Sequence, residues 1–451
     1  MLLNMEKAFV TLLLMTGTAL AQANGTPVAS AVTLHDLKIT PNSTNTGEGQ
    51  VVIPDSSLPK AGDAGQRAHT NYRVFVPKAL AQPRPLAAKP TVGPPFSGYF
   101  NETPSSLACI YALVPVTAGC DPNTLTTVSS RGSRVIAIVD AYHYPSAMDD
   151  LTLFSTQFGL PAPNASNFQV VYGTPGNVQP PTDPTFGWEG EEALDIEMAH
   201  AMAPNAKVIL VEAASNNNSD LLYAEDVASG LVAAANGGEV TNSWGESEFS
   251  GQTALDTHFS TAKVVYFAAA GDSPGVIWPS SSTNVVAVGG TSTSRWLNGY
   301  FLWESSWVDG GGGVSAFVPR KTFQNGLISR IGVWRATPDI AADANPDTGV
   351  WVTCGVGCGG SLGDWYIYGG TSVASPLVAS IVNDAGHFAT STNAELLTIY
   401  ANLGWPTRFN DVTRGVCGPY LAFPTTAGVA PSTAGWDFCT GVGSPNGLNG
   451  L

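Results

Sequence analysis

Residues 134–140 read RVIAIVD, the first of five short apolar runs that decide the fold of this 451-residue chain. The others are KVILVEA (207–213), EVTNSW (239–244), KVVYFAAAG (263–271) and NVVAVGG (284–290). Helical stretches lie near Glu189–Met202 and near Ser219–Ala235, where Ser219 is the expected cap, and one more helix is expected after Gly370. Apolar strands that alternate with helices favour an α/β fold: a doubly wound, mostly parallel sheet with helices on both faces.

The composition excludes two broad classes of partner. The chain has 19 Lys and Arg against 35 Asp and Glu, a formal net charge of −16. Neither nucleic acid nor an anionic membrane is therefore expected as its main partner. Only 12% of the residues are charged and 44% are hydrophobic, which indicates a folded protein. Few charges also leave few ion pairs to lose on acidification, so the composition favours tolerance of acid.

The N-terminal region predicts export. Residues 1–21 pass from Lys7 through an apolar stretch to Ala19-Leu20-Ala21, a pattern typical of a secretory signal peptide, with a membrane anchor as the alternative. The mature chain is expected to be soluble, and extracellular or periplasmic. Residues 22–100 end in a Pro-rich stretch and are interpreted as a short leader, either a reduced propeptide or a linker, before one domain over 101–451.

Six cysteines in an exported chain indicate three disulfides. Nearness in sequence favours Cys109 with Cys120, Cys354 with Cys358, and Cys417 with Cys439, although fifteen pairings are possible. A zinc site is the competing use, but the Cys354 pair has no second close pair or nearby histidine to complete four ligands.

One serine lies where a nucleophile is expected. Residues 369–376 read GGTSVASP, so Ser372 follows a glycine-rich turn at the start of a helix of small apolar residues. Helix N-terminal N–H groups favour negative charge nearby, and the alternative is that Ser372 only caps the helix. None of the six histidines stands in a His-Gly-Thr-like helix start as its base. We interpret His200 as a partly exposed structural residue.

Carboxylates supply the alternative base. Glu191 and Asp195 are four residues apart and share one helix face, in a segment with five acids in nine residues. Like charges at this spacing raise one another's pKa, whereas a solvated helix face is the simpler interpretation. Asp272 directly follows an apolar strand, at the end where α/β sheets place their sites, although aspartate is also common in turns.

Together these segments resemble the sedolisin family of serine-carboxyl peptidases over residues 101–451, which implies a subtilisin-like fold. In that family a Glu-x-x-x-Asp helix supplies the base and its orienting acid, matching Glu191 and Asp195. A Gly-Asp turn supplies an oxyanion-hole residue, matching Asp272, and a Gly-Thr-Ser segment supplies the nucleophile, matching Ser372. Two departures are Gly369, where the family has serine, and a leader much shorter than the family's folded activation domain.

The resemblance extends to a C-terminal calcium-binding loop region. Residues 409–415 and 433–437 are similar to the family's calcium loops, and oxygen ligands suit this hard cation. One Ca²⁺ ion would be bound by the side chains of Asp411 and Asp437 and the carbonyls of Val412, Thr433 and Gly435. A Cys417–Cys439 bridge would hold the two halves of this site together. The alternative is two unconnected turns.

The resemblance implies a secreted, acid-active serine endopeptidase that acts on peptides or unfolded proteins as a monomer. The substrate would lie extended along Ser243, Trp244 and Gly245, although Trp244 could equally pack in the core. Three alternatives remain: a subtilisin-like peptidase that uses histidine and the strand-end Asp140, a two-carboxylate glycosidase, and a non-catalytic binding protein on the same scaffold. In the sedolisin-like interpretation Asp140 is structural.

Overall fold

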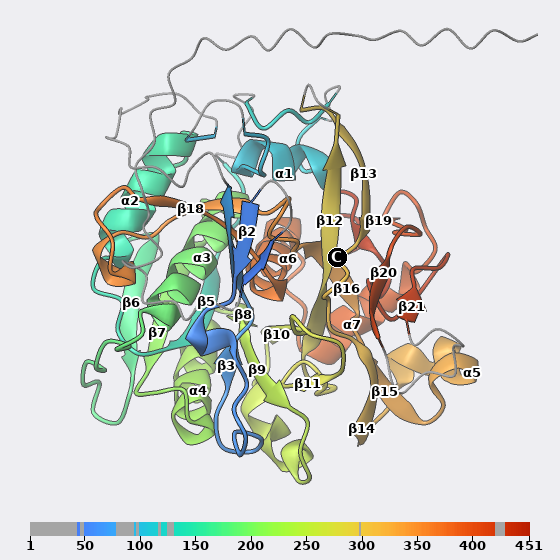
Figure 1. Cartoon of the computed structure of the whole chain (residues 1–451). Helices are drawn as coiled ribbons and strands as arrows, with labels where there is room; N and C mark the ends of the chain where they lie inside the picture. Colours follow the sequence, from blue (N-terminus) through green and yellow to red (C-terminus); the bar gives the residue numbers. More distant parts are fainter. Residues whose placement is uncertain are drawn as a thin grey trace, which may run out of the picture.

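The computed structural model describes residues 43–45, 49–77, 94–95, 99–115, 119–123, 130–296, 299–419 and 429–451. The expected signal peptide lies outside them. Their centre is an eight-stranded sheet (Figure 1). In spatial order its strands are β13 (Phe301–Ser306), β12 (Val286–Arg295), β10 (Val264–Ala269), β8 (Gly238–Asn242), β5 (Val135–Ala141), β7 (Lys207–Ala213) and β6 (Phe168–Gly173), and β16 (Ile340–Asp343) also pairs with β12.

The sheet is mostly parallel, as the sequence predicts. Only the β12–β13 pair is antiparallel. The five apolar runs became β5, β7, β8, β10 and β12. The sequence interpretation did not include β6, β13 and β16.

Helices cover both faces of the sheet. α3 (Gly187–Met202) and α6 (Thr371–Ala385) contact each other and pack on one face, and α4 (Asn218–Ala234) packs on the other. In β5, Ile136 and Ile138 lie in the core shared with α3 and α6, whereas Ala137 and Val139 lie in the core shared with α4. Successive strand residues point to opposite faces, so a strand covered twice must be apolar throughout.

Two details of the helices differ from expectation. The cap of α4 is Asn217, so the prediction of Ser219 was wrong by two residues. A further helix, α7 (Thr392–Ala401), follows α6, where only one helix was expected. The remaining elements are α1 (Pro104–Ile110), α2 (Ala147–Phe158), α5 (Ile328–Ile331), β9 (Trp244–Ser247), β11 (Ile277–Trp278), β14 (Gly313–Pro319), β15 (Trp334–Thr337), β19 (Phe409–Asn410), β20 (Val416–Pro419), β21 (Val429–Pro431) and β22 (Ser444–Pro445).

Part of the leader is built into a second sheet. Its order is β1 (Ser43–Asn45), β2 (Gly49–Val52), β4 (Arg73–Pro77), β18 (Trp365–Gly369) and β17 (Val350–Thr353). The leader strand β4 therefore pairs antiparallel with β18, the strand that leads directly into α6. A third, short sheet places β3 (His69–Thr70) against β9. Leader strands thus lie on both sides of the turn that precedes Ser372.

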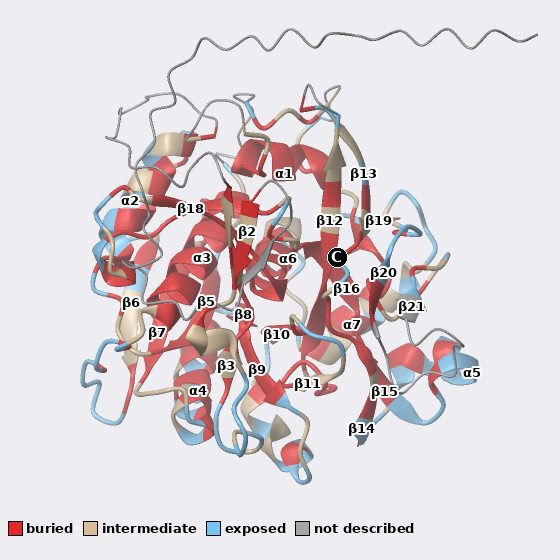
Figure 2. Ribbon diagram, in the orientation of Figure 1, coloured by how far each residue is buried: buried red, intermediate tan, exposed pale blue. Residues whose placement is uncertain are grey.

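All three predicted disulfides are present: Cys109–Cys120, Cys354–Cys358 and Cys417–Cys439. None of the cysteines is left for the zinc site considered above. Figure 2 shows buried residues along the central sheet, α3 and α6, with exposed residues toward the loops. No helix within the described ranges is long and apolar enough to cross a membrane.

Candidate active site

Ser372 lies in the first turn of α6 and does not cap it. The cap is Gly370, whose φ of 108° forms the sharp turn after β18. A Cβ at Gly370 would lie 2.5 Å from Asp272 Oδ2, so glycine is required at this turn. The Ser372 hydroxyl oxygen is 2.9 Å from Glu191 Oε2 and 2.9 Å from the carbonyl oxygen of Ser243, so its single proton can be donated to either. Its geometry is that of a nucleophile beside a base.

α3 is buried on every side, Glu191 and Asp195 included, so the interpretation as a solvated face is wrong. Both side chains have no exposed surface. Asp195 Oδ1 accepts a 2.8 Å hydrogen bond from the Ser243 hydroxyl, and the other Asp195 oxygen has no hydrogen-bond partner within the described part of the chain, nor has Glu191 Oε1. Burial raises the pKa of Asp195, and burial followed by the charges of Asp195 and Asp140 raises the pKa of Glu191.

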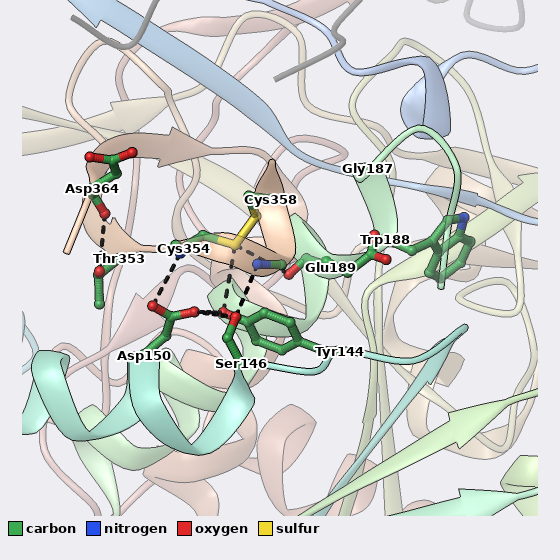
Figure 3. Close-up of a disulfide and its surroundings, with 12 residues drawn as sticks. Tyr144, Ser146, Asp150, Gly187, Trp188, Glu189, Thr353, Cys354, Cys358 and Asp364 are labelled. Carbon is green, nitrogen blue, oxygen red and sulfur yellow. Dashed lines mark hydrogen bonds between the residues drawn. A yellow bond between two sulfur atoms is a disulfide. The ribbon is translucent and has the colours of Figure 1, made fainter. Parts of the chain in front are cut away.

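A disulfide loop supports the start of α3. Figure 3 shows the Cys354–Cys358 bridge beside Glu189, with Cys354 Sγ 3.7 Å from the Glu189 carbonyl oxygen. Asp150 accepts hydrogen bonds from the Gly355 N–H at 3.1 Å and from the Tyr144 hydroxyl at 2.6 Å. The Asp150 bond to Gly355 fixes the loop against α2, and the Cys354 contact places it beside the turn of α3 that precedes Glu191.

Asp272 joins the loop after β10 to the N-terminus of α6. Its Oδ1 accepts the Thr371 N–H at 2.7 Å and the Thr371 hydroxyl at 2.9 Å. Its Oδ2 has no partner among the described residues. Burial raises the pKa of Asp272 to about 7, although Arg73 opposes this shift. Below that pH the carboxyl group is protonated, so Asp272 can donate a hydrogen bond from Oδ2.

The leader crosses this site as an extended strand. His69 lies opposite Gly245 in the antiparallel β3–β9 pair. Asn71 follows, and its backbone N–H lies 3.2 Å from the carbonyl oxygen of Ser243. The backbone of the expected substrate wall, Ser243 to Gly245, therefore already holds a peptide strand.

The carbonyl of Asn71 lies at the nucleophile. Its oxygen accepts the Ser372 N–H at 3.0 Å. A Cβ added to Gly370 would lie 2.2 Å from this oxygen and 2.5 Å from Asp272 Oδ2, so both oxygens border the same small space. Beyond it, Tyr72 stacks on Tyr368 with ring centroids 5.1 Å apart. The Asn71–Tyr72 peptide bond is thus the one presented to Ser372.

The side chain of Trp244 belongs to the core. It has no exposed surface, its indole N–H donates to the Val139 carbonyl at 2.9 Å, and its ring lies 6.0 Å from that of Trp278. Its backbone lines the site, but its side chain does not. This outcome matches the core-packing alternative for Trp244.

The comparisons with known proteins agree with this geometry. Residues 184–386 match the model of the subtilase family. The chain is 29% identical over 358 residues to kumamolisin of Bacillus sp. strain MN-32, covering 69% of this chain and 61% of kumamolisin. It is 30% identical over 192 residues to sedolisin of Pseudomonas sp. strain 101, covering 39% of this chain and 29% of sedolisin. The chain is thus similar to both of these peptidases.

A solved structure supports a subtilisin-like fold for this chain. Pseudomonas sedolisin, a serine-carboxyl proteinase complexed with two molecules of pseudo-iodotyrostatin, superposes with a TM-score of 0.61. The likeness covers 77% of this chain and 95% of that structure, at 24% identity. The chain spans less than two thirds of the length of either relative named above.

Histidine does not serve Ser372 in the described part of the chain. His35 lies outside the described residues. Each of the five described histidines has a hydrogen-bond partner other than Ser372: Thr70 for His69, Glu212 for His143, Pro161 for His200, Asp226 for His258 and Leu451 for His387. His200 is structural as expected, but it is buried rather than partly exposed. The histidine-dependent alternative therefore has no base at the site.

The two expected calcium loops lie together. Asp411 Oδ2 accepts the Gly435 N–H at 3.0 Å, which joins one loop to the other. Asp437 is buried and accepts backbone N–H groups from Thr433 at 2.9 Å and from Cys439 at 2.8 Å. No group of three or more His, Cys, Asp or Glu side chains suited to a metal occurs in the described ranges, and the expected set has only two carboxylates.

Some residues of the site escaped the sequence interpretation. Asn71 gave no signal, because it stands in a leader with no motif around it. Asp140 was placed at a strand end, but it is buried with neither oxygen hydrogen-bonded within the described residues. Burial, then Asp195, then Glu212 raise its pKa, so Asp140 lies in the electrostatic field of the candidate base.

We predict that Asp140→Asn retains turnover within about tenfold of the wild-type protein, because Asp140 touches neither Ser372 nor the Asn71 carbonyl. Loss of its charge should lower the pKa of Glu191, so the acid limb of the pH–rate profile should move to lower pH. Peptide hydrolysis against pH measures both effects. Complete loss of activity in a folded variant would contradict a supporting role for Asp140.

Proposed function

We propose that this protein is an acid-active serine-carboxyl endopeptidase. The observation that carries the proposal is the 2.9 Å contact between the Ser372 hydroxyl and Glu191, beside a peptide carbonyl bonded to the Ser372 N–H. Nucleophile, base and oxyanion donor thus meet at one peptide bond. A two-carboxylate glycosidase leaves this serine without a role.

In the first step Glu191, ionised, takes the proton of Ser372 as the hydroxyl oxygen attacks the carbonyl carbon. The oxyanion that forms is stabilised by the Ser372 N–H and by the protonated carboxyl of Asp272. The carbon–nitrogen bond then breaks, and the leaving amine takes the proton from Glu191. Water, activated by the same carboxylate, hydrolyses the acyl-enzyme and restores the serine.

Asp195 would position the base. It lies one turn from Glu191 on α3, and its own orientation is fixed by the Ser243 hydroxyl. Each carboxyl group has one buried oxygen without a partner among the described residues, so one proton held between the two would satisfy both. Turnover requires that the pair has lost its first proton, because Glu191 must accept one from Ser372.

The pH dependence follows from the signs of these shifts. Activity should rise as the pair loses its first proton, and it should fall as the pH passes about 7, where Asp272 ionises and repels the oxyanion. Burial holds the pKa values of all three carboxyls above their ordinary range. The raised pKa values of the Glu191–Asp195 pair move the rising limb upward from the ordinary carboxyl range, and the raised pKa of Asp272 places the falling limb near pH 7.

We predict that the processed protein releases peptides from an unfolded protein only in acid, across a scan of pH 2–8. Ser372→Ala should lower the rate by a factor of about 10⁶, since it removes the nucleophile. Both proteins are first checked for folding by circular dichroism. A neutral optimum would favour a histidine base, and no cleavage by the folded, processed wild type would favour a binding role.

Asp272→Asn distinguishes two causes of activity loss at high pH in the same assay: ionisation of Asp272 and unfolding of the protein. An amide can donate to the oxyanion at any pH, so the activity of the variant relative to wild type should increase above pH 7. A constant ratio across the scan would exclude Asp272 as the titrating oxyanion donor.

We also propose that the leader is an inhibitory propeptide cleaved between Asn71 and Tyr72. Its strands β3 and β4 occupy both sides of the site, which would exclude other substrates until they leave. The three disulfides suit the oxidising compartment to which residues 1–21 would direct the chain. We expect the mature enzyme to act as a secreted monomer, outside the cell or in the periplasm.

We predict that wild-type protein incubated in acid gains a new N-terminus at Tyr72, whereas Ser372→Ala keeps the bond intact. N-terminal sequencing and intact mass measure the cut. A Gly370→Ala chain is a second control, because its Cβ would displace the Asn71 carbonyl. The same cut in purified Ser372→Ala would show that another enzyme makes it.

We propose that the loops at the C-terminus bind one calcium ion. Their donors are hard oxygen atoms; Asp437 Oδ1 already accepts from Cys439 and Thr440, so Asp437 would bind the ion through Oδ2, which accepts only the Thr433 N–H among the described residues. Arg330 contacts the same loop, with Nη2 3.2 Å from Thr433 Oγ1, and its positive charge would weaken the binding. Asp411, Asp437 and the carbonyls of the sequence prediction would hold the ion, which would stabilise these loops rather than enter the reaction.

We predict that calcium raises the thermal midpoint of Ser372→Ala protein by a few degrees and that a chelator reverses the shift. The Ser372→Ala background prevents self-digestion during the scan. Adding Asp411→Asn and Asp437→Asn should abolish the response, whereas Asp226→Asn, an exposed acid elsewhere, should keep it. An equal shift in the double-aspartate variant would place the ion at another site.

A further inference from the structure

Arg73 is held by a group of contacts outside the catalytic residues. Its Nη1 lies 2.6 Å from Asp309 Oδ2, and its Nη2 donates to the Asp272 carbonyl oxygen. Its guanidinium carbon is 5.1 Å from the ring centroid of Trp307. A carboxylate, a carbonyl oxygen and an aromatic face together suit the planar, forked guanidinium group of arginine.

The position of Arg73 relative to the presented bond is fixed by the backbone. Arg73 lies opposite Gly369 in the β4–β18 pair, and it is the second residue after the Asn71 carbonyl. A peptide substrate could pair with β18 in the same register. The second residue on the C-terminal side of its cleaved bond would then occupy the position of Arg73. The groups that hold Arg73 all lie within residues 101–451. A cut before Tyr72 leaves Arg73 in the processed chain, so a substrate reaches these groups once β4 has moved off β18.

The local charge favours a cation and disfavours an anion. Asp309 is 42% exposed, so an incoming side chain can reach it from solvent. A second carboxylate is near, because the charge of Asp309 contributes to the raised pKa of Asp347. The aromatic face belongs to Trp307, which is buried and therefore rigid. Lysine could pair with Asp309 but could not fork to the Asp272 carbonyl as well.

We propose that Asp309 and Trp307 form a specificity subsite for arginine, and less strongly lysine, at the second residue after the cleaved bond. This inference rests on the proposed function and names the class of peptide that the enzyme prefers. In the intact chain Arg73 fills the subsite, so the leader is bound by the same contacts as a preferred substrate.

The test compares peptides with one changed residue. Processed protein is given quenched fluorescent peptides with the sequence AHTNYRVF of residues 68–75, and versions with Ala or Glu in place of the arginine. At the pH of maximal activity, kcat/KM should be about tenfold lower for the Ala peptide, because an exposed ion pair and a cation–π contact are both modest. It should be lower still for the Glu peptide, and the preference should shrink at high salt.

Variants of Asp309 test the assignment. Asp309→Asn should lower the rate on the arginine peptide toward that on the Ala peptide, and Asp309→Lys should make the Glu peptide the better of the two charged ones. Asp226→Asn is the matched control and should keep the full arginine preference. Equal rates on all three peptides with wild-type protein overturn the subsite and leave the peptidase standing. Failure to cleave any peptide at any pH overturns both.

Discussion

The hydrogen bond between the Ser372 hydroxyl and Glu191 is the interaction on which the site depends, because it joins two helices that no short-range contact relates. It forms only where α3 and α6 pack against each other on one face of the sheet. Each helix is fixed from another direction as well. The disulfide loop at Cys354 supports the start of α3, and Asp272 receives the first N–H of α6. The positions of Ser372 and Glu191 are thus set by the packing of the two helices and by these contacts.

Burial gives these carboxyls their chemistry. On an exposed helix face Glu191 and Asp195 would ionise as ordinary acids, whereas without exposed surface their neutral forms are favoured. The same holds for Asp272. In the proposed mechanism these buried acids share protons, and ionisation of Asp272 near pH 7 would remove its hydrogen-bond donor.

The leader strand shows how an extended peptide pairs with the backbone around Ser372. It runs along β9 before the Asn71 carbonyl and along β18 after it, so the backbone of the enzyme supplies most of the register. Side-chain recognition is added at separate points. Asp309 and Trp307 hold Arg73. A cavity of about 330 Å³ is lined by His69 of the leader, by Trp188 at the start of α3 and by Asn216 in the loop before α4.

Much of this protein could be predicted from its sequence, because some signals are local. Apolar runs specify strands buried on both faces, so RVIAIVD and its four companions were enough to predict a mostly parallel sheet, although they did not include β6, β13 and β16. The spacing of Glu191 and Asp195 placed them on one helix face, and nearness in sequence was enough to pair six cysteines. Tertiary structure alone decided that this helix is buried on every side and that the Trp244 side chain packs in the core. It also decided that Asp140 lies close enough to raise the pKa of Glu191. It alone brought Asn71 to Ser372, 301 residues away in sequence. Such contacts are set by packing between elements distant in the chain, and no local pattern of residues records them.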